Sequence, residues 1–212
     1  MKPLWTRMTH NRRLFVSNLL IAVGCMLLLY VGWAYFMMWN NQRTLAKQWH
    51  EHHEQPVAPG AKPQFVDDGL VQVLIPKASV DAIVVDGVTR KMLAVGPGHM
   101  PSTPMPGENG NSVISAHRDT FFRKIGDLQK GDDVIVRRAG KVFHFAVANK
   151  KIVDPDDLSV LKQTKVPELT LITCYPTYFI GPAPKRLIVV SQLTRSEPDT
   201  GDLATNLPSG SR

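Results

Sequence analysis

The chain is poor in cysteine and holds only two, Cys25 and Cys174, among its 212 residues. A disulfide-rich secreted scaffold is therefore excluded, because such small domains depend on several cross-linked pairs. Cys25 lies inside an apolar N-terminal run, where we expect it to be one more small residue of a helix. It cannot reach Cys174, so no intramolecular disulfide is expected. The unpaired Cys174 is therefore a candidate for chemistry.

Charged residues are absent from residues 19–39. About twenty apolar residues in a helix are long enough to cross the hydrocarbon core of a bilayer. We predict a transmembrane anchor over 14–39 after a cytoplasmic basic flank over 1–13, because basic residues without acidic ones precede the run. A cleaved signal peptide is the competing interpretation, but the apolar run continues well past Cys25, which favours an uncleaved anchor.

The chain also lacks a basic stripe with interleaved aromatic residues, although its formal net charge is +7. Lysines and arginines are scattered among acidic residues, which argues against nucleic acid as a partner. The chain also lacks two separate segments of metal-binding residues that could together form a site. His50, His52 and His53 form a short cluster without cysteines nearby, which is more typical of a solvated linker than of a metal site. We predict no metal site.

Short β-rich runs recur from about residue 65 to residue 193, separated by glycine and proline. They lie at 71–75, 82–85, 111–116, 133–137, 141–148, 168–173 and 186–192. Short strands at this spacing predict a closed or nearly closed all-β barrel over 65–195, with a brief helical turn at 154–161. The polar, proline-bearing segment 40–64 is expected to be a stalk or linker, and the polar tail 196–212 to be disordered.

Three chemically active side chains stand at the ends of three of these runs. His117 follows the run at 111–116, Cys174 closes the run at 168–173, and Arg186 opens the last one. If the last two runs pair as a hairpin, Arg186 returns to the side of Cys174. A side chain at a strand end is held rigid yet reaches solvent, as a nucleophile requires. Each residue alone is more often structural, but their joint occurrence predicts a catalytic constellation.

The segments that carry these residues resemble the three signature segments of sortases, the cysteine transpeptidases of bacterial surfaces. They read SAHRDTFF at 115–122, LTLITCYP at 169–176 and PKRLIV at 184–189, in the order and spacing of that family. The pairing of CYP with GPAPKR is most similar to class D sortases. The resemblance implies an eight-stranded barrel, and because seven runs are evident, we expect the eighth strand around 91–95.

The resemblance also implies a role for each residue. Cys174 is the expected nucleophile, His117 the general acid and base, and Arg186 the donor that stabilises an oxyanion or the substrate. A guanidinium stays protonated, so Arg186 cannot act as a base. Thr173 and Tyr175 are expected to help shape the substrate groove. No cofactor is expected to be required. Some sortases hold Ca²⁺ in acidic loops, and the sequence leaves Ca²⁺ open because it cannot show whether loop oxygens converge. The loop acids are Glu108, Asp132, Asp133, Asp154, Asp156 and Asp157.

By resemblance, the substrate is an exported protein with a C-terminal sorting motif, LPxTG or LPxTA, cleaved after threonine through a thioacyl intermediate. The acyl group passes to an amine on cell-wall peptide or protein, and water in its place gives hydrolysis. The expected location is a bacterial plasma membrane, spanned once, with the catalytic domain outside. An L,D-transpeptidase is the rival of the same class, but its S-x-G-C-x-R arrangement is absent. A catalytically silent anchored barrel for peptide binding or surface assembly is the alternative of a different class.

Overall fold

The computed structural model describes residues 4–53, 69–178 and 181–199, and the chain divides into two compact units. The first unit, Met1–Asn41, holds most of a long helix, α1 (Leu4–His53). Among the described residues, α1 is the one helix long and apolar enough to cross a membrane. Its apolar side chains between Leu14 and Trp39 are largely exposed, as expected where lipid replaces water as the solvent. This N-terminal apolar helix fits the predicted anchor.

The helix runs further than the expected anchor. It continues through more than half of the segment 40–64, which was expected to be a stalk, and ends at His53. The polar residues of this segment are compatible with a helix because no proline occurs in it before Pro56. The rest of the stalk lies outside the described residues, as do the side chains of His50, His52 and His53.

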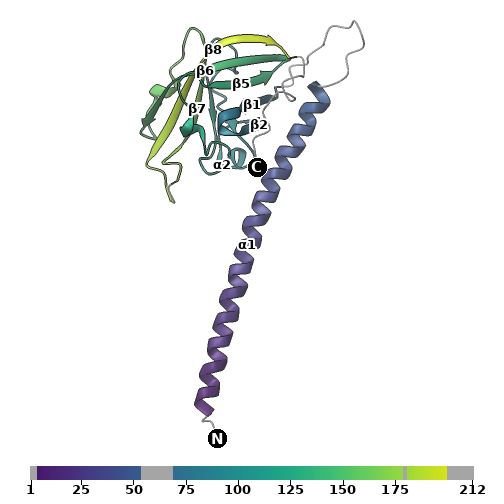
Figure 1. Cartoon of the computed structure of the whole chain (residues 1–212), viewed down its shortest axis with the longest axis vertical. Helices are drawn as coiled ribbons and strands as arrows, with labels where there is room; N and C mark the ends of the chain where they lie inside the picture. Colours follow the sequence, from purple (N-terminus) through teal and green to yellow (C-terminus); the bar gives the residue numbers. More distant parts are fainter. Residues whose placement is uncertain (1–3, 54–68, 179–180, 200–212) are drawn as a thin grey trace. The chain divides into compact units, whose positions relative to one another are not determined.

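The second unit, Gln42–Arg212, holds a closed barrel (Figure 1). Its eight strands are β1 (Val71–Ile75), β2 (Val80–Asp86), β3 (Gly98–His99), β4 (Gly110–Ser115), β5 (Asp133–Arg138), β6 (Lys141–Val153), β7 (Pro167–Tyr175) and β8 (Lys185–Pro198). Around the barrel they follow the order β1-β2-β3-β4-β7-β8-β6-β5. Short helices in the connections are η1 (Pro76–Ala78), α2 (Arg90–Leu93), η2 (Ile125–Asp127) and η3 (Leu158–Leu161). The predicted all-β, eight-stranded barrel with short helices is confirmed.

One face of each strand fills the barrel interior. On β7, Leu169 and Leu171 are fully buried in a single apolar cluster together with Leu187 and Val189 of β8. Successive side chains point to opposite faces of a strand, and Cys174 is three residues after the buried Leu171. Cys174 therefore lies on the outer face of β7. The apolar period of the strand thus decides which side of the barrel carries the thiol.

The eighth strand is not where the sequence predicted it. Residues 91–95, where it was expected, belong mostly to the helix α2 and the turn after it, and the hydroxyl of Thr89 accepts a hydrogen bond from Met92 N at 3.4 Å as an N-cap. The missing strand is β3, which has only two residues and pairs with β2 and β4. Gly98 is required there, because a Cβ at this position would collide with the carbonyl oxygen of Gly87.

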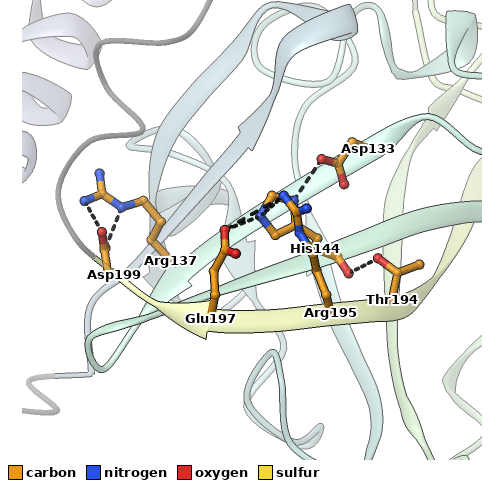
Figure 2. A network of polar contacts seen from close by, with 7 residues as sticks. All are labelled: Asp133, Arg137, His144, Thr194, Arg195, Glu197 and Asp199. Atoms are coloured by element: carbon orange, nitrogen blue, oxygen red, sulfur yellow. Dashed lines mark hydrogen bonds and ion pairs between the residues drawn. The ribbon is translucent and has the colours of Figure 1, made fainter.

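The barrel also ends later than predicted. β8 continues past residue 195, the expected boundary, and Pro198 still pairs with Lys141 of β6. The next residue, Asp199, is buried against Arg137 of β5, whose Nε and Nη2 donate to its carboxylate at 2.6 and 2.9 Å (Figure 2). This ion pair and the backbone pairing with β6 together hold a polar segment against the barrel. The remainder of the predicted tail, 200–212, lies outside the described residues.

Candidate active site

Strands β7 and β8 set Cys174 and Arg186 side by side. The two strands are antiparallel, and their register makes Cys174 the direct partner of Arg186. Residues directly opposite one another in such a pair have Cα atoms about 5 Å apart and side chains on the same face. The hairpin inferred from the sequence is therefore present.

Strand β4 brings His117 to the same end of the barrel. β4 and β7 are parallel, with Ser115 level with Ile172, and the ladder continues with a hydrogen bond from Ala116 N to Ile172 O at 3.1 Å. Continuing this register places His117 level with Cys174 on the neighbouring strand. The chain then turns, with Phe122 N bonded to His117 O at 3.1 Å, and the fully buried Phe122 ring anchors the turn in the core.

The three side chains remain accessible. His117, Cys174 and Arg186 are all half-buried. In the described part of the chain no hydrogen bond or ion pair joins any two of them, and Arg186 Nη1 instead donates to the carbonyl oxygens of Lys185 at 3.0 Å and Ala183 at 3.4 Å. A guanidinium has five N–H donors, so Arg186 keeps donors for a substrate. A thiol, an imidazole and a guanidinium at three adjoining strand ends can support nucleophilic attack, proton transfer and oxyanion binding.

Thr173 and Tyr175 occupy the opposite face of β7. Thr173 is 1% exposed, and its hydroxyl donates to the carbonyl oxygen of Ala116 at 2.8 Å, while Tyr175 packs against the barrel core. In this structure both residues support the strand that carries Cys174, and Thr173 also ties it to the strand that leads to His117. A contact of either residue with substrate stays a prediction.

Arg118 is close to the site and was not singled out from the sequence. It follows His117 directly, and its guanidinium donates to the carbonyl oxygens of Pro176 at 3.0 Å and Gly181 at 2.5 Å. The sequence shows a cation next to the expected general acid. It cannot show which backbone carbonyl groups this cation binds, because they belong to residues far away in the sequence.

Two of the six acidic residues considered for Ca²⁺ form ion pairs with lysines. Asp154 pairs with Lys185 at 2.6 Å and Asp132 with Lys77 at 2.7 Å. The hydrogen bond from Lys77, followed by one from the backbone N–H of Gln129, lowers the pKa of Asp132 below its ordinary value. In the described ranges, no three His, Cys, Asp or Glu side chains converge in an arrangement suited to a metal ion. Whether Ca²⁺ affects the protein stays open to experiment.

A cavity of about 340 Å³ lies on the outer side of the barrel, and the residues of β7 that line it are on the same face of the strand as Cys174. Thr170 and Glu168 of β7 and Val190 of β8 line it, together with Lys151 and residues of the η3 connection. Glu168 and Cys174 are six residues apart on one face of β7, or about 20 Å along an extended strand. Burial raises the pKa of Glu168, and the nearby Lys151 partly opposes this shift.

Replacing Glu168 with glutamine is expected to stabilise the protein at neutral pH. A carboxyl with a raised pKa holds its proton more tightly in the folded state, so its contribution to stability falls as pH rises from below 4.5 through the raised value. Glutamine has no charge to bury, so Glu168→Gln should have a higher free energy of unfolding than the parent protein at neutral pH. The difference between the two proteins should shrink when the pH is lowered below 4.5. Urea unfolding of the full chain in detergent micelles across this pH range measures it.

The exposed Asp156, in the connection that precedes η3, provides the control. Asp156→Asn makes the same chemical change without burial, so it should show no comparable dependence on pH. An equal pH dependence in both variants would contradict the assignment of the effect to burial of Glu168.

Comparison with known proteins identifies the family. A family model described as the sortase domain matches residues 73–194, more than half of the chain. The chain therefore belongs to the sortase family. This match contains all three strand ends described above, with His117, Cys174 and Arg186.

The likeness to class D sortases is also confirmed. The chain is 41% identical over 116 residues to sortase D of Bacillus subtilis (strain 168), which covers 54% of this chain and 59% of that protein. Among solved structures, a Clostridium perfringens sortase D5 transpeptidase has a TM-score of 0.55 at 30% identity, covering 59% of this chain and 79% of that one. Sortase A of Listeria monocytogenes has a TM-score of 0.59 at 25% identity, covering 68% and 97%. The chain spans less than two thirds of the length of the first curated relatives it matches.

Proposed function

We propose that this protein is a membrane-anchored cysteine transpeptidase that cleaves exported proteins within a C-terminal LPxTG-like or LPxTA-like motif, after the threonine. The observation that supports the proposal is the pairing of three strands: Cys174 of β7 is the partner of Arg186 of β8, and β4, which leads to His117, runs beside β7. Membership of the sortase family supports the same reaction class.

The proposed reaction proceeds in two halves. The Cys174 thiolate attacks the threonine carbonyl carbon, the peptide C–N bond breaks, and protonated His117 gives its proton to the leaving amine. A second amine then attacks the thioacyl carbon and releases the thiolate, while His117 takes the proton from this amine. Arg186 donates hydrogen bonds to the oxyanion of each tetrahedral state. These steps use side chains of this chain and need no cofactor.

The anchor gives the reaction a location. We propose that α1 spans a bacterial plasma membrane once, with the basic N-terminal flank in the cytoplasm and the barrel outside. Enzyme and exported substrate would then meet on one surface, which raises their effective concentration. The acceptor is an amino group on cell-wall peptide or on another protein.

The full chain in detergent micelles is expected to cleave LPxTG or LPxTA peptides after threonine and to exchange the released group for an added amine. Mass spectrometry should find the acyl group on Cys174 before exchange, because the thioester is an obligatory intermediate of the proposed path. Parallel reactions with Ca²⁺ and with a chelator measure whether the ion is needed. If neither peptide gives cleavage or an adduct, the result favours an enzyme with a different motif first and a silent peptide-binding barrel second. Mild alkylation separates these two alternatives, because Cys174 of a silent barrel should react slowly.

A further inference from the structure

Arg118 binds the connection between β7 and β8 at two points, its first residue Pro176 and the more distant Gly181. Its Nη1 donates to the carbonyl oxygen of Pro176, two residues after Cys174, at 3.0 Å, and its Nη2 donates to the carbonyl oxygen of Gly181, five residues before Arg186, at 2.5 Å. Both acceptors lie more than fifty residues away in sequence. One side chain thus joins two backbone positions that lead into the two strands of the site.

The chemistry of arginine suits this arrangement. A guanidinium is planar and rigid, so two carbonyl groups bound to its two terminal nitrogens are held at a defined separation. Hydrogen bonds from a charged donor are also stronger than those between neutral groups. Arg123, in the same segment, is exposed and makes no such bonds in the described part of the chain. The contacts of Arg118 are therefore not a general property of this segment.

We propose that Arg118 is a positioning residue for the transpeptidase site. By holding Pro176 and Gly181 together, it fixes the connection between β7 and β8 and, through it, the orientation of Cys174 relative to Arg186. Because Arg118 is bonded covalently to His117, the same side chain also ties the general acid to this backbone. The inference rests on the proposed function, and it assigns Arg118 no contact with the reacting atoms.

The test compares Arg118→Ala and Arg118→Lys with Arg123→Ala as the matched control, all in the full chain in detergent micelles. Three quantities are measured: hydrogen exchange of the backbone amides between Pro176 and Arg186, the rate of Cys174 alkylation against pH, and kcat and KM for peptide cleavage. Thermal unfolding of each variant shows whether its barrel is intact.

Arg118→Ala is expected to raise amide exchange in the connection, to alter the pH profile of Cys174 alkylation, and to lower kcat by about 10- to 100-fold. Arg118→Lys should recover only part of kcat, because an ammonium cannot present two donors in one rigid plane. Arg123→Ala should match the parent protein in all three measurements.

Two results would overturn the proposal. One is unchanged exchange in the connection of Arg118→Ala. The other is a loss of kcat that follows a lower unfolding temperature while exchange and alkylation stay as in the parent. If the parent protein shows no Cys174-dependent cleavage, the proposed function fails, whereas the exchange and alkylation data still decide whether Arg118 positions this connection.

Discussion

Cys174→Ala is expected to lower the rate of peptide cleavage by at least about 10⁴-fold, because removing the nucleophile removes the covalent path altogether. Residual catalysis can then come only from binding and from oxyanion stabilisation by Arg186. The acyl adduct should disappear together with the activity. Initial rates over a range of enzyme concentrations, with mass spectrometry of the intact chain, measure both losses.

The chain supplies its own control for this experiment. Cys25 is the other free cysteine, and it lies in the apolar part of α1. Cys25→Ala should leave both the rate and the adduct unchanged. Cleavage that survives Cys174→Ala, or that is lost with Cys25→Ala, would contradict the assignment of the nucleophile.

Asp199→Asn is expected to destabilise the barrel by about 3–5 kcal/mol, because it leaves a buried cation without its counter-charge. The Arg137 and Asp199 side chains are only 3% and 4% exposed, and two hydrogen bonds join them (Figure 2). Arg137 also donates to Gln72 at 3.2 Å and lies over the ring of Trp49, 5.7 Å from its centre. Asparagine keeps the size of the side chain but cannot balance the guanidinium.

The exposed ion pair between Asp154 and Lys185 is a matched control. It has the same 2.6 Å separation, but its side chains are 63% and 46% exposed, so water screens the pair. Asp154→Asn should cost less than about 1 kcal/mol. Urea unfolding of both variants in detergent micelles measures the difference in the free energy of unfolding. Equal costs would show that burial does not set the strength of the Arg137–Asp199 pair.

The sequence predicted the positions of seven strands, but it made the two longest, β6 and β8, too short and misplaced the shortest. Six-residue runs such as 111–116 show their apolar character directly, so β4 was found to within one residue at each end. β3 has two residues, too few for any period, and it exists because β2 and β4 offer it hydrogen-bonding partners. Residues 91–95, where the eighth strand was expected, lie in or directly after the helix α2, which Thr89 caps at its N-terminus.

Side-chain facing was harder to infer than strand position. The family resemblance predicts that Thr173 and Tyr175 help shape the groove, and this stays a prediction. The structure adds that both lie on the face of β7 opposite to Cys174, because adjacent residues of a strand point to opposite sides. The end of the barrel was placed too early. A polar segment that ends in Asp199 has the composition of a disordered tail, but its backbone pairs with β6 and the carboxylate of Asp199 binds the buried Arg137 of β5.

By itself, the sequence determined the apolar N-terminal helix, the all-β class of the following domain and the three residue types at strand ends, because each follows from a local pattern of polarity or from a short motif. The tertiary structure alone decided that Cys174 faces Arg186, that His117 stands level with them, and that Arg118 and Asp199 find partners far along the chain. The physical reason is that strand register and barrel closure depend on the packing of the whole apolar core, to which residues distant in sequence contribute together.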